Sequence, residues 1–223
     1  MSATFRIKIC GITNVEDALA VARADADAVG LNFYAKSPRC VRVEHARQIV
    51  EALPARIVKV GVFVNASCDE VCRTFDRVGL DLIQVHGDEP PEFLSNLGAR
   101  PAMRAFRLLE GRLAPILEYL ERCRELGCLP RMILIDSHRA GAYGGTGALA
   151  DWTAAAGYPA ADWHPPLVLA GGLGPENVAQ AICAVRPAGV DTASGVELEP
   201  GWKSEILVRQ FVEAAREGFA AAR

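Results

Sequence analysis

The sequence predicts an α/β fold in which one parallel sheet closes into a barrel. Short β-branched segments alternate with amphipathic helical segments about eight times along the chain, without a break in composition. Most of the predicted strands are apolar on both faces, which is typical of parallel strands covered by helices. A chain of 223 residues also has a suitable length for a single TIM barrel, the (β/α)8 architecture. We therefore expect one barrel domain over residues 1–223.

A doubly wound open sheet is the alternative arrangement of the same elements. That fold carries a G-x-G-x-x-G phosphate-binding turn after its first strand. Here the first predicted strand is followed by Gly11-Ile12-Thr13, which contains one glycine. The closed barrel is therefore favoured over the open sheet.

Composition excludes several classes of partner. The 24 basic and 27 acidic residues give a net charge of −3 and are spread along the chain, so no nucleic-acid partner is expected. No apolar segment approaches the roughly 18–20 residues of a membrane span, and the N-terminus lacks a signal-peptide pattern. The seven cysteines form no CxxC pair and no Cys/His cluster at zinc spacing, so we expect reduced thiols and no metal. A cytoplasmic protein is the expectation.

Strand and helix patterns can be assigned in order along the first half of the chain. The β-branched segment Arg6–Cys10 predicts the first strand, and Thr13 is the candidate N-cap of a helix that continues to about Ala26. Later strands are expected at apolar β-branched segments, and later helices where apolar residues recur at 3.6-residue spacing. The next segments are the strand Ala28–Phe33, the helix Val43–Leu53, the strand Ile57–Val64, the helix Asp69–Phe75 with Asn65 or Ser67 as its cap and Gly79 as its end, and the strand Leu80–His86.

The second half continues this alternation around one glycine-rich loop. Residues 137–147 contain Gly144-Gly145-Thr146-Gly147 and are expected to form a loop after the sixth strand. The segment Pro101–Arg107 has the weakest strand pattern. The expected segments are the helix Pro91–Leu97, the strand Pro101–Arg107, the helix Leu113–Leu126 ended by Gly127, the strand Arg131–Asp136, a helix around Ala148–Ala155, the strand Pro166–Ala170, a helix starting at Pro175, the strand Ala188–Gly195, and a helix from about Lys203 to Ala220.

Side chains at the carboxyl ends of barrel strands face one shared mouth, so residues far apart in the sequence are expected to converge there. Gly171-Gly172 follows the seventh strand and Ser194-Gly195 follows the eighth. These loops form the usual phosphate site of barrels, because small residues let backbone N–H groups approach an anion. Gly145 would add a third donor, and a phosphorylated small molecule is the expected ligand. Alternatively, the glycines only permit tight turns.

Two further polar residues are expected near the mouth. Arg39, in a Ser-Pro-Arg loop, is a candidate to bind a carboxylate through paired charge-assisted hydrogen bonds, with a solvated surface arginine as the alternative. His86 ends the fourth strand and either lines the pocket or is a hydrogen-bonded core histidine. We assign it no proton transfer.

Cys10 and Asp136 form the candidate acid/base pair. A thiolate is a strong base once its pKa is lowered, and a shielded carboxylic acid can donate its proton. The alternatives are a structural cysteine and an aspartate that caps a helix or pairs with a cation. Alternation along the first strand places Lys8 inside the barrel below Cys10, and we expect Asp191 on the eighth strand as its counter-charge. Such a cation would favour the thiolate.

A series of short motifs occurs in order from Ile7 to Lys203. In one-letter code they are KICGIT (Lys8–Thr13), SPR (Ser37–Arg39), VGVFVN (Val60–Asn65), QVHGDE (Gln84–Glu89), IDS (Ile135–Ser137), GGTG (Gly144–Gly147), LAGGL (Leu169–Leu173) and SGVE (Ser194–Glu197). Together these motifs closely resemble the phosphoribosylanthranilate isomerase family of tryptophan biosynthesis.

The resemblance implies a TIM barrel that converts N-(5-phosphoribosyl)anthranilate to 1-(2-carboxyphenylamino)-1-deoxyribulose 5-phosphate by an Amadori rearrangement without a cofactor. It assigns the general base to Cys10, the general acid to Asp136 and the anthranilate carboxylate to Arg39. It assigns the phosphate to the glycine loops. A monomer or homodimer is expected.

Two positions depart from the family pattern. Ala193 stands where a serine is usual, so one hydroxyl contact to the phosphate is expected to be missing. Gly201-Trp202-Lys203-Ser204 replaces Gly-x-Lys-Asp, a change expected to affect the start of the last helix more than the chemistry.

Two alternative functions use the same fold. Indole-glycerol-phosphate synthase needs a catalytic lysine and glutamate at strand ends and an N-terminal extension, and neither pattern is found here. A non-catalytic phosphosugar-binding barrel would keep the glycine loops but lose the acid and the base. The presence of Cys10 and Asp136 argues against it.

Overall fold

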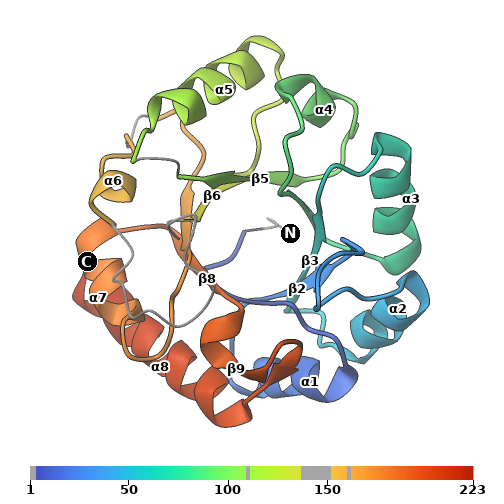
Figure 1. The fold of residues 1–223 in the computed structure, drawn as a ribbon, viewed down its shortest axis with the longest axis vertical. Helices are drawn as coiled ribbons and strands as arrows, with labels where there is room; N and C mark the ends of the chain where they lie inside the picture. The colour runs from blue at the N-terminus through green and yellow to red at the C-terminus, as the bar shows by residue number, and fades with distance from the viewer. Residues whose placement is uncertain (1–3, 109–110, 137–151, 160–161, 223) are drawn as a thin grey trace.

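The computed structural model describes residues 4–108, 111–136, 152–159 and 162–222, and these form the predicted TIM barrel. Parallel strands pair in sequence order, and the last pairs with the first, so the sheet closes on itself (Figure 1). The strands are β1 (Ile7–Cys10), β2 (Ala28–Asn32), β3 (Val58–Phe63), β4 (Leu82–Val85), β5 (Ala102–Arg107), β6 (Met132–Asp136), β7 (Leu167–Ala170) and β8 (Gly189–Thr192).

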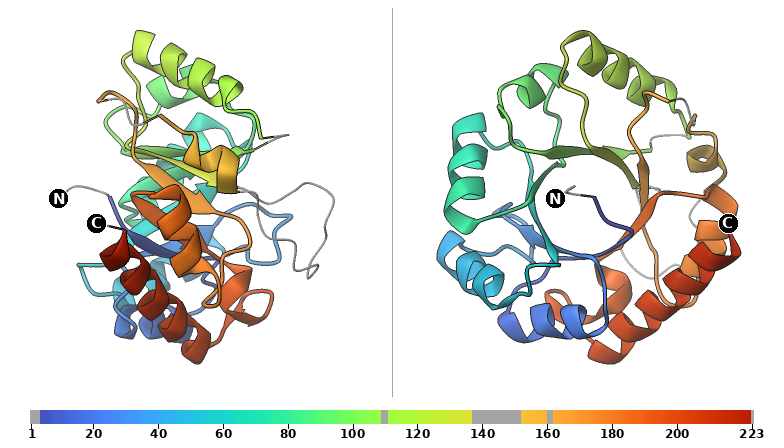
Figure 2. Two further views of the ribbon diagram at one scale, coloured as in Figure 1. Left: turned by 90° about the vertical axis from the view of Figure 1, so that its left-hand side faces the viewer. Right: turned by 180° about the vertical axis from the view of Figure 1, so that it is seen from behind.

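Helices form a ring outside the sheet, as the two further views show (Figure 2). They are α1 (Val15–Arg23), α2 (Val43–Ala52), α3 (Cys68–Val78), α4 (Pro91–Ser95), α5 (Ala114–Glu125), α6 (Trp152–Ala156), α7 (Val178–Val185) and α8 (Glu205–Ala221). Residues 148–151 of the helix expected around Ala148–Ala155 lie outside the described residues. Each strand of the barrel and each described helix of the ring falls at or near its expected segment, including β5, whose sequence pattern was the weakest.

Apolar side chains pack in two layers separated by the sheet. Ile7 and Ile9 belong to the larger cluster, in which strand residues pack against helix residues such as Phe211. A smaller cluster, which includes Met103 and Leu134, fills the inside of the barrel. Burial of one such isoleucine contributes about 1.5–3 kcal/mol. This arrangement confirms that the odd-numbered isoleucines of β1 face the helices, so their neighbours face inward.

The start and end of α1 differ from the sequence-based prediction. Thr13 is not the N-cap; the cap is Asn14, whose Oδ1 accepts a hydrogen bond from the backbone N–H of Asp17 at 2.8 Å. Thr13 instead donates its hydroxyl to the carbonyl of Gly201 at 2.6 Å. The helix ends at Arg23 rather than near Ala26, because Asp25 has a φ of +66° and cannot continue a right-handed helix.

The prediction that a helix starts at Pro175 was also wrong, because α7 starts at Val178. The Oδ1 atom of Asn177 accepts a hydrogen bond from Gly174 N at 2.9 Å, and its amide donates to Gly172 O at 3.0 Å. These bonds hold the preceding residues in a turn. The helix start is thereby tied to the loop that follows β7.

Other predicted caps are confirmed. Ser67, one of the two candidates, accepts a hydrogen bond from Glu70 N and caps α3, and Gly79 ends that helix with a φ of +77°. The last helix starts at Glu205, with Ser204 as its N-cap, rather than at Lys203. This agrees with the expectation that the Gly201–Ser204 segment shapes the start of this helix.

One element has no counterpart in the sequence-based prediction. After β8, a short 3₁₀ turn (Ser194–Val196) leads into an antiparallel hairpin of β9 (Glu197–Glu199) and β10 (Trp202–Lys203). Hydrophobic alternation does not predict this hairpin, because each of its strands spans only two or three residues. The hairpin packs beside α1 at the mouth end of β8 (Figure 1).

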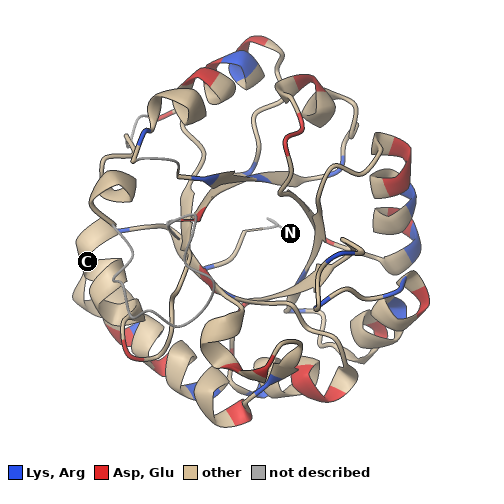
Figure 3. Ribbon diagram, in the orientation of Figure 1, with Lys and Arg blue, Asp and Glu red and all other residues tan. Residues whose placement is uncertain are grey.

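Basic and acidic residues are interspersed around the ring of helices (Figure 3). Many form exposed ion pairs, such as Arg47 with Glu51 along α2. Exposed pairs of this kind stabilise a fold by only about 0–1 kcal/mol each. Across the described ranges, no helix is both long and apolar enough to cross a membrane.

Candidate active site

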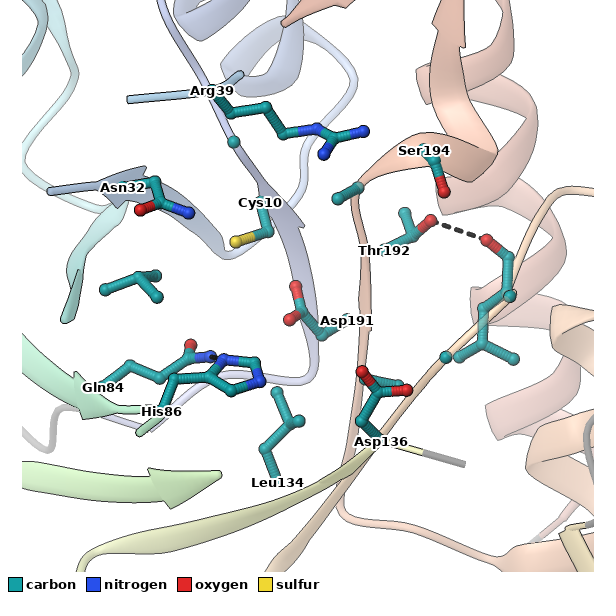
Figure 4. A pocket seen from close by; sticks show the side chains of 17 residues that line it. Cys10, Asn32, Arg39, Gln84, His86, Leu134, Asp136, Asp191, Thr192 and Ser194 are labelled. Carbon is teal, nitrogen blue, oxygen red and sulfur yellow. Dashed lines mark hydrogen bonds between the residues drawn. The ribbon is translucent and has the colours of Figure 1, made fainter. Parts of the chain in front are cut away.

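A cavity of about 450 Å³ opens at the carboxyl ends of the barrel strands (Figure 4). Most of the side chains predicted from the sequence converge there, although they come from strands and loops spread along the chain. The predicted residues that line the cavity are Cys10, Arg39, His86, Asp136, Gly171, Gly172 and Ser194. Gly195 is not among the lining residues, and Gly145 lies outside the described residues.

Cys10 ends β1 and projects its thiol into the cavity. The neighbouring strand makes room for the sulfur through Gly30, where an added Cβ would lie 2.6 Å from Sγ. No van der Waals contact between carbon and sulfur is that short, so a side chain at this position would displace the thiol. Gly30 is a site residue that only the pairing of β1 with β2 reveals.

Lys8 lies fully buried one step below Cys10, and it pairs with Asp191 as predicted. The two residues are direct partners across the seam between β1 and β8, with Lys8 Nζ 2.7 Å from Asp191 Oδ2. Burial raises the pKa of Asp191, whereas Asp191 and Cys10 together hold the pKa of Lys8 above its ordinary value against the cost of burial. A raised pKa favours the charged form of Lys8 but the neutral form of Asp191, so the two shifts oppose each other. The short contact between Nζ and Oδ2 favours the charged pair.

The thiol of Cys10 has a raised pKa, because burial penalises the thiolate more than the nearby cations stabilise it. Lys8 and Lys203 both lower this pKa, whereas the carboxylate of Asp191 raises it. Lys8 therefore lowers the pKa of Cys10 as expected, but in the ligand-free protein burial raises this pKa by more than Lys8 lowers it. The sequence could not reveal this result, because the desolvation depends on how tightly the barrel packs around the sulfur.

Asp136 is the last residue of β6, His86 directly follows β4, and both side chains reach the cavity. In Figure 4 the carboxyl group of Asp136 and the thiol of Cys10 lie on different sides of the opening, and Asp191 appears between them. Burial lowers the pKa of His86 to about 4, although Asp136 opposes this effect, so the ring is neutral at physiological pH.

Gln84 orients the His86 ring. Its Nε2 atom lies 3.0 Å from His86 Nδ1. With the amide oriented as in the structure, its N–H donates to Nδ1, so the proton of the neutral ring sits on Nε2. Gln84 is almost fully buried and lines the cavity, yet the sequence analysis did not assign it. Strand alternation provided a signal, because Gln84 and His86 are two positions apart and share a face.

Arg39 does not point freely into solvent. Its Nε and Nη2 atoms donate to the two carboxylate oxygens of Glu197 at 2.8 and 2.6 Å. Its stem lies over Gly11, where an added Cβ would overlap Arg39 Cδ. The surface-arginine alternative is therefore wrong, and Glu197, 158 positions away in the sequence, is a partner that no local pattern predicts.

The glycine loops after β7 and β8 pack against each other beside the cavity. Thr192 donates its hydroxyl to the carbonyl of Leu173 at 2.6 Å, and an added Cβ at Gly195 would overlap that same carbonyl oxygen. Gly171 and Gly172 have φ angles of +97° and +65°, which favour glycine. The tight-turn requirement is therefore real at these two positions, and it coexists with their place in the cavity wall.

The sequence analysis did not assign Lys203 to the site, yet the structure places its side chain against Glu197 and the loop after β8. Its ammonium donates to Glu197 Oε1 at 2.7 Å and to the carbonyl of Ala193 at 3.0 Å. Ala193 itself lines the cavity. Lys203 therefore connects the Arg39 partner to the loop after β8.

No group of three or more His, Cys, Asp or Glu side chains within the described ranges is placed to hold a metal ion. The polar groups at the mouth are instead a thiol, carboxyl groups, a neutral imidazole and a guanidinium. Such a set is suited to proton transfer on a bound anionic substrate.

Comparison with known proteins places this chain in a family. The family model described as N-(5'phosphoribosyl)anthranilate (PRA) isomerase matches residues 7–214. The isomerase of that name from Pseudomonas paraeruginosa is 48% identical over 213 residues, which cover 95% of each chain. The one from Rubrobacter xylanophilus is 46% identical over 213 residues, covering 95% of this chain and 98% of the relative.

Solved structures agree with the sequence relatives. Phosphoribosyl anthranilate isomerase from Thermotoga maritima has a TM-score of 0.84 at 39% identity, covering 96% of this chain and 99% of that chain. A phosphoribosyl anthranilate isomerase in complex with reduced 1-(o-carboxyphenylamino)-1-deoxyribulose 5-phosphate has a TM-score of 0.81 at 38% identity, with the same coverage. The chain therefore belongs to the N-(5′-phosphoribosyl)anthranilate isomerase family, whose enzymes convert N-(5′-phosphoribosyl)anthranilate to 1-(2-carboxyphenylamino)-1-deoxyribulose 5-phosphate in tryptophan biosynthesis.

Proposed function

We propose that Cys10 is the general base and Asp136 the general acid of this isomerase. The observation that carries the proposal is that both side chains line one cavity, together with a fixed guanidinium and two glycine loops. In the first step Asp136 protonates the ring oxygen of the ribose, and the C1–O bond breaks to give an open-chain protonated Schiff base. Cys10, as thiolate, then removes the proton on C2.

The second half of the reaction restores the proton balance. Loss of the C2 proton places the electron pair in a C1–C2 double bond and gives a neutral enolamine. Its C2 hydroxyl loses a proton while C1 gains one, which yields the ketone. The thiol of Cys10 must then lose one proton and the carboxylate of Asp136 must regain one, so the net reaction is an isomerisation without an external reductant.

The raised pKa of Cys10 makes the order of these steps important. In the ligand-free protein, burial keeps the thiol protonated more than is usual. Proton transfer from Asp136 leaves a carboxylate on that residue and a positive charge on the Schiff base next to C2, where Cys10 acts. This positive charge adds to the effects of Lys8 and Lys203, which both favour the thiolate. Ring opening by Asp136 therefore prepares the base for the second step.

Substrate binding follows from the remaining groups of the cavity. Arg39 binds the anthranilate carboxylate with the N–H groups that Glu197 does not occupy, because a guanidinium carries five donors. The loops with Gly171, Gly172, Ser194 and Gly195 bind the phosphate through backbone N–H groups. Gly145, which lies outside the described residues, is proposed to add a donor. The missing hydroxyl at Ala193 removes one side-chain contact but no backbone donor.

His86 contributes to binding rather than to proton transfer in this proposal. Its pKa of about 4 leaves it neutral during turnover, and its Nε2–H can donate a hydrogen bond to a substrate oxygen. A protonated imidazole would be needed for acid catalysis, and burial opposes that form.

A monomer or homodimer in the cytoplasm is proposed for the assembled enzyme. One structural neighbour, 37% identical with a TM-score of 0.80, consists of monomers of the dimeric isomerase from Thermotoga maritima. Light scattering on the purified protein distinguishes the two states, which have masses of one or two 23.9 kDa chains.

An assay that follows the loss of phosphoribosylanthranilate fluorescence tests the roles. Cys10→Ser and Asp136→Asn are each expected to lower kcat by about 10²–10⁴-fold, with substrate binding changed by only a small factor. Cys40→Ser, at an exposed cysteine, is the matched control and should keep wild-type turnover. Wild-type-like turnover in Cys10→Ser or Asp136→Asn would refute the role of that residue, and no turnover by folded wild-type protein would refute the activity.

A further inference from the structure

Arg39, Glu197 and Lys203 form a buried charge cluster beside the cavity, which we call the Glu197 cluster. Glu197 accepts hydrogen bonds from Arg39 Nε and Nη2, from Lys203 Nζ and from the backbone N–H of Gly201, at 2.8, 2.6, 2.7 and 3.2 Å. The carboxylate side chain is 4% exposed and the ammonium side chain is 0% exposed. Only Arg39 reaches the cavity wall.

The charges of the cluster favour an anionic ligand. Burial opposes the ionisation of Glu197, but the hydrogen bonds from Arg39 and Lys203 outweigh it and lower the pKa of the carboxyl group. The same contact holds the pKa of Arg39 above its ordinary value. An Arg39–Glu197 pair alone would be neutral, whereas the ammonium of Lys203 leaves the cluster with a net charge of +1 at the edge where Arg39 faces the cavity.

The hairpin that carries the cluster is attached to the start of the barrel. Thr13 donates its hydroxyl to Gly201 O at 2.6 Å, and Asp17 Oδ2 accepts the backbone N–H of Lys203 at 3.0 Å. The hairpin is thereby fixed to the loop after Cys10 and to α1. Because the guanidinium is planar and two of its N–H groups are committed to Glu197, its remaining donors have a fixed direction.

We propose that Glu197 and Lys203 are positioning residues for substrate binding: Glu197 fixes the Arg39 guanidinium in the orientation that receives a substrate carboxylate, and Lys203 holds Glu197 and offsets its charge. Neither residue touches the substrate. This inference rests on the proposed role of Arg39. It adds that carboxylate recognition depends on a hairpin that follows the last barrel strand.

For Glu197→Gln, a purely electrostatic effect and the positioning role predict opposite changes in the affinity for a carboxylate ligand. Glu197→Gln removes a negative charge near the ligand, so a purely electrostatic effect would tighten the binding of a carboxylate. The positioning role predicts weaker binding, because the amide replaces one of the two acceptors of the guanidinium with a donor. The expected result is a rise of about tenfold in the Kd for reduced 1-(o-carboxyphenylamino)-1-deoxyribulose 5-phosphate. Ribose 5-phosphate, which lacks the carboxylate, should bind Glu197→Gln as it binds the wild type.

Steady-state kinetics distinguish the positioning role of Glu197 from a merely structural role, because the two predict different changes in KM and kcat. If the carboxylate is held equally in the ground state and the transition state, KM rises about tenfold in Glu197→Gln while kcat stays near the wild-type value. General loosening of the fold would instead lower the active fraction and kcat at unchanged KM. Glu199→Gln removes the same charge from an exposed position on the same hairpin and should change neither constant.

Further variants separate the outcomes. Arg39→Ala tests the underlying role: unchanged affinity of this variant for the carboxylate ligand would overturn the proposed function of Arg39 itself. Weaker binding by Arg39→Ala together with equal or tighter binding by Glu197→Gln would overturn only the positioning inference. If Glu197→Gln does not fold, Glu197→Asp keeps the charge on a shorter side chain, and a raised KM with unchanged kcat is again expected. A wild-type KM for Glu197→Asp would contradict the inference.

Discussion

Lys8 and Asp191 form an ion pair inside the barrel, directly beneath the Cys10 thiol. Their Cα atoms are register partners across the seam where β1 meets β8, and Lys8 Nζ lies 2.7 Å from Asp191 Oδ2. Lys8 is fully buried and Asp191 almost so. Isolated charges at such a place would be very costly, so each residue requires the other.

Lys8→Met is expected to destabilise the protein by about 3–5 kcal/mol, because it leaves the Asp191 carboxylate buried without its partner. Urea denaturation followed by circular dichroism measures the change in the free energy of unfolding. The double variant Lys8→Met with Asp191→Asn removes both charges and should recover part of the loss. Equal stability of the Lys8→Met single variant and the wild type would show that the buried Asp191 carboxyl group does not require the Lys8 ammonium.

The pH dependence of kcat/KM is expected to reflect the buried thiol. Because burial raises the pKa of Cys10, the thiolate fraction of the free enzyme increases through a midpoint above that of an ordinary thiol, and kcat/KM should rise with it. Lys8 lowers this pKa, so Lys8→Gln should move the midpoint to still higher pH. A midpoint unchanged in Lys8→Gln would contradict the link between the ammonium and the thiol.

The difference between the Lys8 pair and the Glu197 cluster shows what the sequence can predict. Period-two alternation along β1 and closure of the sheet place Lys8 inward and next to β8, so Asp191 follows from two general rules. The contact between Arg39 and Glu197 joins loops 158 positions apart through a hairpin of very short strands. No periodicity marks that hairpin, and the partner of Arg39 therefore appears only in three dimensions.

The direction of the Cys10 pKa is a second quantity that only the structure provides. The sequence correctly indicates a cation under the thiol, and this cation acts in the expected direction. Whether it prevails depends on desolvation, which is set by the packing of the whole barrel around the sulfur. Strand order and the residues at the strand ends thus follow from local pattern and topology, whereas the electrostatic balance at the thiol requires the packed interior.

Arg39→Ala is expected to weaken the binding of a carboxylate ligand more than the binding of phosphate. The guanidinium is proposed to contact the anthranilate carboxylate, whereas the glycine loops after β7 and β8 are proposed to hold the phosphate. Calorimetric titrations with inorganic phosphate and with an anthranilate-bearing analogue measure the two affinities separately. An equal loss for both ligands would contradict the division of roles between Arg39 and the loops.

Gly11→Ala is expected to raise KM by displacing Arg39. Gly11 has a φ of +77°, and an added Cβ would overlap Arg39 Cδ. Gly127→Ala is a matched control, because Gly127 has a φ of +65° with nothing within 4 Å of an added Cβ. Both variants incur the cost of a left-handed alanine, about 1 kcal/mol, but only Gly11→Ala should change KM. A similar KM in the two variants would show that the contact with Arg39 is unimportant.

His86 is expected to make the protein less stable as the pH falls from about 6.5 toward 4. Its pKa is lowered from 6.5 to about 4 in the folded protein, chiefly by burial, so in this window the unfolded chain binds a proton that the folded protein does not. Stability is therefore lost as the pH falls and is fully present above the unfolded pKa. The difference between the two pKa values corresponds to about 3 kcal/mol.

Measurement of the free energy of unfolding between pH 4 and 7 checks this contribution. His86→Gln keeps a polar side chain that cannot titrate, so its stability should decline less steeply than that of the wild type over the same window. His45→Gln removes an exposed histidine on α2 and should retain the wild-type slope. If His86→Gln lost stability as steeply as the wild type, the acid sensitivity would come from other groups, and the neutral imidazole assigned to the cavity would lose its support.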